Sequence, residues 1–201
     1  MKKKLIHAAV FLLISFTAGA QLQPGAVYPG ISVTKNLLTY NANAVRGELE
    51  VGLSKHNSLG LFLRYTRYIN SRSKDSSGFV PKGNTAETEA GLSFSSFRYF
   101  NKKSKWGTLL NAEAGISKIN VYEDNGSGNL LRLSYHRINL SITPGIFYAP
   151  SPKVMLVGNI GGFTLSTVKN AGIEGTSDIG QRITLGARFT LGGKKKNNAL
   201  K

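Results

Sequence analysis

The stretch "RGELEVGL", residues Arg46 to Leu53, alternates between two kinds of side chain. Its odd-numbered positions are small or apolar, and its even-numbered positions include the charged residues Arg46, Glu48 and Glu50. A period of two is typical of a β-strand whose two faces meet different surroundings. The class of protein therefore depends on which face of this strand lies inside the fold.

The same alternation recurs along the chain, and no segment after Gln21 has a convincing helical repeat. Short connections near residue 56, at 101–105 and at 149–153 alternate with longer polar loops at 70–84, 123–129 and 169–179. This asymmetry is typical of up-and-down outer-membrane barrels, which have short periplasmic turns and longer outer loops. The predicted strands are Tyr28–Leu38, Asn43–Ser54, Ser58–Ile69, Thr85–Phe100, Trp106–Tyr122, Leu130–Tyr148, Val154–Val168 and Gly180–Leu191.

The N-terminus predicts export through a cleavable signal peptide, residues 1–20. Three lysines precede an apolar run from Leu5 to about Phe16, and the small residues Ala18 to Ala20 follow. The run is shorter than the roughly 20 apolar residues that span a bilayer as a helix. The net charge of +16 is otherwise typical of nucleic-acid binding, but export and the lack of a nucleic-acid motif argue against such a partner. We expect a barrel domain at 21–191 and a basic tail at 192–201.

The charged side chains of the strands favour a polar interior. Lys is nearly absent from the strand interiors, where the cations are Arg, whose planar guanidinium pairs well with carboxylates in enclosed sites. Buried charges must be paired, and an eight-stranded barrel has a lumen just wide enough to be filled by side chains. We therefore predict an all-β fold, an eight-stranded antiparallel up-and-down transmembrane β-barrel whose aliphatic faces contact lipid. The predicted lumen charge network is Arg46, Glu48, Glu50, Arg64, Glu87, Glu89, Glu113, Arg182 and Arg188.

Two further features follow from the same pattern. The apolar face of the sixth strand changes from odd to even positions at His136-Arg137, which predicts a β-bulge there. Aromatic residues near the strand ends suit the girdles that membrane barrels place at the two interfaces. The girdle candidates are Tyr28, Tyr65, Trp106, Phe147, Tyr148 and Phe189.

Two segments carry a resemblance to a known group of proteins. They are "PGIFYAPSPKVMLVGNIGGFTL", Pro144 to Leu165, and the last strand, in which Thr184, Gly186, Phe189 and Leu191 have the spacing polar-x-Gly-x-x-aromatic-x-hydrophobic. With these segments, residues 27–191 resemble the small outer-membrane β-barrel families, the eight-stranded porin-like domains of Gram-negative envelopes. The resemblance implies that the last strand is the signal read by the outer-membrane assembly machinery. Typical members end on an aromatic residue, whereas this chain continues through "GGKKKNNALK".

The sequence offers no catalytic, metal or cofactor motif. There is no Cys, no pair of His has metal-ligand spacing, and no Ser lies in a G-x-S-x-G turn. We expect an integral outer-membrane protein with a structural or surface-interaction role, a lumen that passes at most a slow leak, and no enzymatic activity. One alternative is a soluble secreted or periplasmic barrel that binds an apolar ligand. A weaker one is a lipid-modifying barrel enzyme, for which Ser76, Ser127 and Asp178 are available.

Overall fold

The computed structural model describes residues 22–36, 41–69, 85–101, 104–124, 130–168, 172–177, 179 and 181–192. The predicted signal peptide and nearly all of the basic tail lie outside these residues. The described chain contains ten β-strands, and none of its helices is long and apolar enough to cross a membrane. The strands are β1 (Val27–Asn36), β2 (Asn41–Gly52), β3 (Asn57–Ile69), β4 (Thr85–Tyr99), β5 (Trp106–Asp124), β6 (Leu130–Ser151), β7 (Val154–Asn159), β8 (Phe163–Val168), β9 (Gly172–Ser177) and β10 (Arg182–Phe189).

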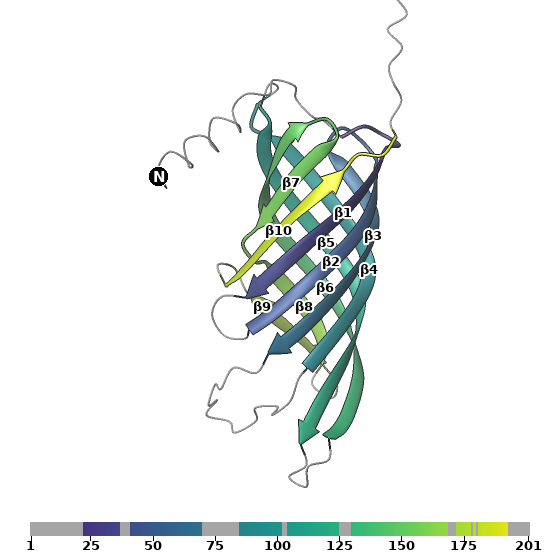
Figure 1. The fold of residues 1–201 in the computed structure, drawn as a ribbon, viewed down its shortest axis with the longest axis vertical. Coiled ribbons are helices and arrows are strands. Elements are labelled where there is room, and N and C mark those ends of the chain that lie inside the picture. The colour runs from purple at the N-terminus through teal and green to yellow at the C-terminus, as the bar shows by residue number, and fades with distance from the viewer. Residues whose placement is uncertain are drawn as a thin grey trace, which may run out of the picture.

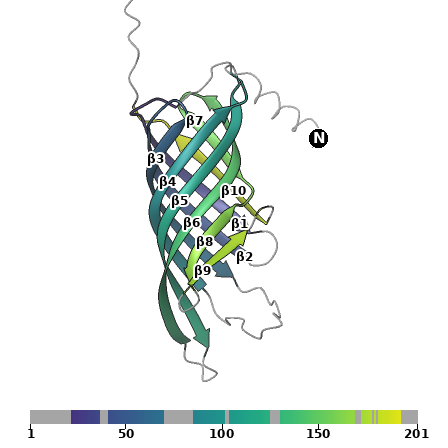
Figure 2. The same ribbon diagram turned by 180° about the vertical axis from the view of Figure 1, so that it is seen from behind.

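Eight of these strands close into an antiparallel ring, which confirms the predicted fold. Each of β1 to β6 pairs with its successor, β7 pairs with β6 and β10, and β10 returns to pair with β1. The strands are tilted, and β5 and β6 project beyond the others at one end of the barrel (Figures 1 and 2). Closure pairs each of these eight strands with two neighbours, as a barrel in a membrane requires, whereas β9 pairs only with β8.

The two ends of the barrel are built differently. At one end, here called the turn end, short turns join β2 to β3, β4 to β5 and β6 to β7. The first of these turns is held by Ser54, whose hydroxyl accepts hydrogen bonds from the backbone N–H groups of His56 and Asn57. The other end, here called the loop end, carries the longest connection, residues 70–84 between β3 and β4, and the projecting ends of β5 and β6 (Figure 1).

The seventh predicted strand, Val154–Val168, is not continuous. It is interrupted at residues 160–162, where Gly161 has a φ of 89° and a side chain at Gly162 would collide with the carbonyl oxygen of Ile142. β7 pairs with β6 and β10, whereas β8 pairs with β6 and β9. Residues 172–177, predicted to be part of a loop, instead form β9 in a hairpin with β8, and β10 begins only at Arg182.

The predicted bulge at His136-Arg137 is wrong. The β5–β6 register runs without interruption from Trp106 opposite Tyr148 to Asp124 opposite Leu130. His136 therefore points outward with Ile138, and Arg137 points inward with Asn139. In the sequence, the apolar residues of β6 change from odd to even positions at this point. The change arises because this part of β6 lies beyond the outward apolar band, where the outer face of the strand need not be apolar.

The long aliphatic faces of the strands point outward. Leu61, Ile116 and Leu185 are each about 60% exposed, and the charged faces of the same strands are buried inside the barrel. The predicted aromatic girdle is only partly correct. Tyr65, Trp106 and Phe189 are exposed on the outer wall, but Tyr28 and Phe147 are buried on the inward faces of their strands. Tyr148 is also buried, with its ring 4.5 Å from that of Trp106.

Candidate functional site: the barrel lumen

The lumen is closed at the turn end by an apolar cluster. Phe147 lies at its centre, with ring centroids 5.4 Å from Phe97 and 4.8 Å from Tyr99 in edge-to-face contact. Phe97 and Phe147 have almost no exposed surface. Such packing excludes water from this end of the lumen. The cluster, here called the apolar plug, is Leu22, Ala26, Tyr28, Phe97, Tyr99, Leu109, Phe147, Ala149, Met155 and Val157.

A buried carboxylate adjoins the apolar plug. Glu50 is fully buried and accepts hydrogen bonds from the hydroxyls of Ser58 at 2.5 Å, Ser93 at 3.1 Å and Ser95 at 2.9 Å. Nη1 of Arg188 lies 2.8 Å from Oε2 of Glu50. A carboxylate with one cation and three hydroxyl donors has the compensation that a buried charge requires.

Arg188 joins the apolar plug to the charged middle of the lumen. Its Nε and Nη2 donate to the two oxygens of Glu48 at 2.6 and 3.2 Å, the bidentate geometry that favours Arg over Lys. Its guanidinium carbon lies 5.3 Å from the ring centroid of Phe97. Gly30 leaves the space for this pair, because a Cβ there would lie 2.6 Å from Oε1 of Glu48.

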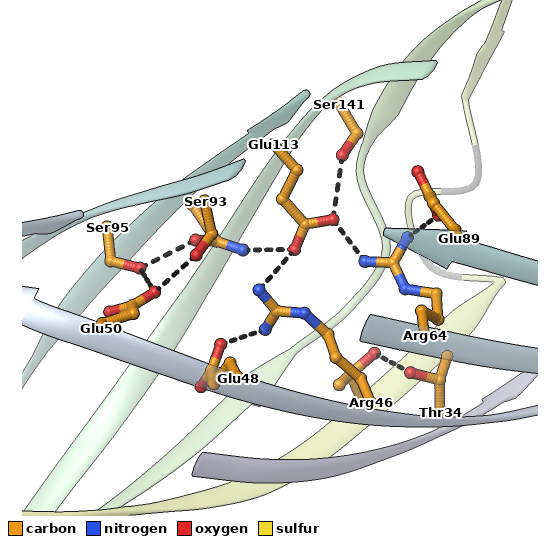
Figure 3. Close-up of polar contacts among 12 residues, drawn as sticks. Thr34, Arg46, Glu48, Glu50, Arg64, Glu89, Ser93, Ser95, Glu113 and Ser141 are labelled. Carbon is orange, nitrogen blue, oxygen red and sulfur yellow. Dashed lines mark hydrogen bonds and ion pairs between the residues drawn. The ribbon is translucent and has the colours of Figure 1, made fainter. Parts of the chain in front are cut away.

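Glu113 is the centre of the network. It forms ion pairs with Arg46, at 3.0 Å between Nη2 and Oε1, and with Arg64, and it accepts a hydrogen bond from Nδ2 of Asn111 at 2.7 Å. Arg46 also pairs with Glu48, and Nη1 of Arg64 lies 2.9 Å from Oε2 of Glu89. Figure 3 shows Glu113 between the two guanidinium groups.

Neutral side chains complete this part of the lumen. Both guanidinium groups stack on Phe62, with their central carbons 5.0 and 5.2 Å from its ring centroid. Nδ2 of Asn139 donates to Oε1 of Glu89 at 3.1 Å, and the hydroxyl of Ser166 donates to Oδ1 of Asn139. Side chains from β2, β3, β4, β5, β6, β8 and β10 thereby form one connected network, which ties together strands that are not neighbours in the sheet.

A polar cavity of about 230 Å³ runs beside the network, from the plug residues Leu109 and Val157 toward the loop end. Arg137 and Arg182 line it, together with Tyr68, whose hydroxyl donates to Glu87 at 2.7 Å. The network and the cavity thus hold five Arg and five Glu, whose formal charges balance. They are Arg46, Arg64, Arg137, Arg182, Arg188, Glu48, Glu50, Glu87, Glu89 and Glu113.

The nine charged residues singled out in the sequence all lie on the inward faces of their strands. Seven are joined by ion pairs, Glu87 bonds to Tyr68, and Arg182 lines the cavity. Sequence reasoning missed Arg137. The expected bulge would have interrupted the alternation that places Arg137 on the same inward face as Asn139. It also missed the apolar plug, since Phe97 and Phe147 occupy the face that is polar elsewhere.

Residues of the expected assembly signal lie along β10 and just after it. Phe189 and Leu191 are exposed on the outer wall, whereas the hydroxyl of Thr184 lies 2.8 Å from that of Thr34 in the lumen. Gly186 lies between Ser32 and Val157, where its partners leave little space for a side chain. Recognition of these residues by the assembly machinery stays a prediction.

No group of three metal-ligating side chains occurs among the residues that the structure describes. The candidates for a lipid-modifying site, Ser76, Ser127 and Asp178, lie outside the described residues. An apolar-ligand carrier would need the Ile, Leu and Phe faces to point inward. In this barrel those faces point outward, and the cavity is lined mainly by polar and charged groups.

No protein-family model matches the sequence, and no curated protein matches it. Among solved structures, the chain is similar to Neisserial surface protein A, with 17% identity over 83% of this chain and 96% of that one and a TM-score of 0.51. It also matches the N-terminal β-barrel domain of OprF from Pseudomonas aeruginosa, at 15% identity over 84% of this chain and 99% of that one, with a TM-score of 0.49. Ail from Yersinia pestis matches at 11% identity over 85% and 99% of the two chains, with a TM-score of 0.43. The similarity to Neisserial surface protein A and the closed strand order together show the fold of the small eight-stranded outer-membrane β-barrels.

Proposed function

We propose that the mature chain is an integral outer-membrane protein that stabilises the envelope and presents its loop end to the outside. One observation carries the proposal: the wall of the barrel is apolar and its interior is charged and internally paired. A water-soluble barrel requires the opposite arrangement, because such an extensive apolar surface would associate or aggregate in water. A lipid bilayer is the solvent that this wall fits.

The orientation follows from the two ends. Outer-membrane barrels keep short turns on the periplasmic side and longer loops outside. The turn end therefore faces the periplasm, and the loop end, with the projecting hairpin of β5 and β6, faces outward. A role in contact with an external partner is consistent with this projection.

The lumen supports a barrel that does not conduct. The apolar plug fills one end, and the ion pairs around Glu113 cross the middle. Any solute path must separate these charges or displace Phe97 and Phe147, at a cost of several kcal/mol. A steady leak through the lumen would therefore contradict the proposal.

Fractionation and gel mobility test the membrane assignment. The mature protein should remain with the outer membrane until detergent is added, and the extracted barrel should migrate differently on a denaturing gel with and without heating. Recovery of the protein in the soluble periplasm would overturn the assignment. In planar lipid bilayers the purified barrel should give no steady conductance, and stable channels in the wild-type protein would overturn the closed-lumen part alone.

A further inference from the structure

Three cations and a histidine lie on the outer wall at the boundary of the apolar band nearest the loop end. On β1, the outward residue after Val33 is Lys35, and on β3, the outward residue after Tyr65 is Arg67. On β5, Lys118 follows Ile116 in the same way. On β6, His136 is the next outward position beyond Ile138. The three cationic side chains and the imidazole of His136 are exposed.

The strand register brings these positions together. Lys35 lies opposite Asn43, which in turn lies opposite Arg67, so the three residues cross β1, β2 and β3 in one line. Lys118 lies directly opposite His136, and on its other side it lies opposite Thr88 of β4. Neighbouring strands are about 4.8 Å apart, so adjacent members of the set are within reach of one headgroup. This set of six residues, Lys35, Asn43, Arg67, Thr88, Lys118 and His136, is here called the basic arc.

Nothing in the described part of the chain neutralises the basic arc. Neither its three cationic side chains nor the imidazole of His136 has a hydrogen bond or an ion pair there. The five Glu of strands β2, β4 and β5 with described side chains face the lumen and are occupied by Arg, Ser, Asn and Tyr. The hairpin of β8 and β9 carries Thr167 and Ile173 at its outward positions, so the cations form an arc on one side of the barrel.

We propose that the basic arc binds the phosphate groups of anionic lipids in the outer leaflet. This inference rests on the proposed membrane location, because only there does the end of the apolar wall coincide with a headgroup layer. Guanidinium and ammonium groups are the usual donors to phosphate, and long cationic side chains at the edge of an apolar wall extend into the headgroup region. Asn43 and Thr88 add neutral donors between the cations, which suits a headgroup with several oxygens.

The test uses the full mature barrel in non-ionic detergent micelles and native mass spectrometry to count bound lipid. The probes are diphosphorylated lipid A and the same lipid without its phosphates. Removal of three cations, in Lys35→Gln/Arg67→Gln/Lys118→Gln, should weaken binding of the phosphorylated lipid by roughly 100-fold, at about fivefold per cation. Binding of the dephosphorylated lipid should be unchanged.

A matched control removes the same charge at the turn end, in Lys55→Gln/Arg98→Gln/Lys153→Gln, where all three residues are exposed. The control should retain the preference for the phosphorylated lipid. Equal loss in both triple variants, or no preference in the wild-type protein, would overturn the proposal. Displacement of the lipid by millimolar inorganic phosphate would show that the arc takes the free ion, which also contradicts it.

Two readouts keep the outcomes separate. A heat-dependent shift in gel mobility reports whether each variant is folded. If the wild-type barrel shows no such shift, the proposed membrane location is contradicted, rather than lipid binding by the basic arc. If the triple variant does not fold, the single variants Lys35→Gln and Arg67→Gln each replace it. Each should lose roughly fivefold in affinity for the phosphorylated lipid, and unchanged affinity in both would overturn the proposal.

Discussion

The apolar plug and the charged middle of the lumen fill the same barrel by opposite means. Around Phe147 the strands contact one another through aromatic rings, whereas around Glu113 they contact one another through ion pairs. A small barrel must fill its interior, and either solution does so. The two regions differ in the effect of a substitution. Removal of a ring from the plug leaves a void, whereas removal of one partner from the network leaves an uncompensated charge.

The largest effect is expected from breaking the network at its centre. Glu113→Leu removes the carboxylate shared by Arg46 and Arg64, and an unpaired buried cation costs roughly 3–5 kcal/mol. Urea unfolding of the barrel in lipid vesicles measures the loss. As a control, Glu174→Leu on the exposed strand β9 should change stability by less than about 0.5 kcal/mol. Equal stability of Glu113→Leu and the wild-type protein would refute the network.

Opening the plug should cost somewhat less but add a new property. Phe147→Ala removes the ring between Phe97 and Tyr99, at a cost of about 3 kcal/mol, the lower end of the range for such truncations. It should also admit water at the turn end and produce measurable ion conductance in planar bilayers. The lipid-facing change Phe94→Ala is the control and should produce none. If Phe147→Ala stays electrically silent, the plug is not what closes the turn end.

The geometry of a single pair gives a smaller effect. Arg188→Lys keeps the charge but removes the planar guanidinium group that binds both oxygens of Glu48 and one oxygen of Glu50. We expect the free energy of unfolding to fall by about 1.5–3 kcal/mol. Arg67→Lys, on the outer wall without an ion-pair partner in the described chain, should be neutral in the same unfolding assay. Equal tolerance of Lys at both positions would mean that charge alone, rather than the bidentate geometry, stabilises the lumen.

The smallest effect concerns the outer wall beside the plug. Trp106→Leu removes the ring that lies against Tyr148 at 4.5 Å but keeps an apolar side chain toward lipid. The expected loss is about 0.5–1.5 kcal/mol, the usual contribution of an aromatic pair. Tyr65→Leu, at the opposite boundary, is the comparison. A larger loss from Trp106→Leu than from Phe147→Ala would place the main stabilising contacts of this end outside the lumen.

The contrast between plug and network also explains what sequence reasoning achieved. Period-two alternation was sufficient for the strands, their faces and the inward position of residues such as Glu50 and Arg188. It did not reveal which charges pair, because Glu113 and Arg46 meet through the closure of the barrel rather than through sequence proximity. Phe97 escaped notice and Phe147 was assigned to the interfacial girdle, since an aromatic residue near a strand end fits the girdle as well as an inward plug.

The errors in β6, β7 and β9 have a common physical origin. Alternation predicts faces only where one face meets lipid and the other is enclosed. Beyond the apolar band, around Arg137, that constraint ends, and the apparent change of phase was mistaken for a bulge. At Gly161 the backbone adopts a conformation that side chains disfavour, so the strand breaks without any change in the hydropathy pattern.

The central claim is that the apolar wall faces lipid and the charged wall faces the lumen. The chain has no Cys, so single cysteines can carry a spin label at Leu140, on the outer wall, or at Ser141, beside the cavity. In vesicles the label at 140 should collide freely with dissolved oxygen and hardly with a water-soluble nickel complex. The label at 141 should show low oxygen accessibility. The reverse pattern, or equal accessibility to oxygen at both sites, would contradict the account.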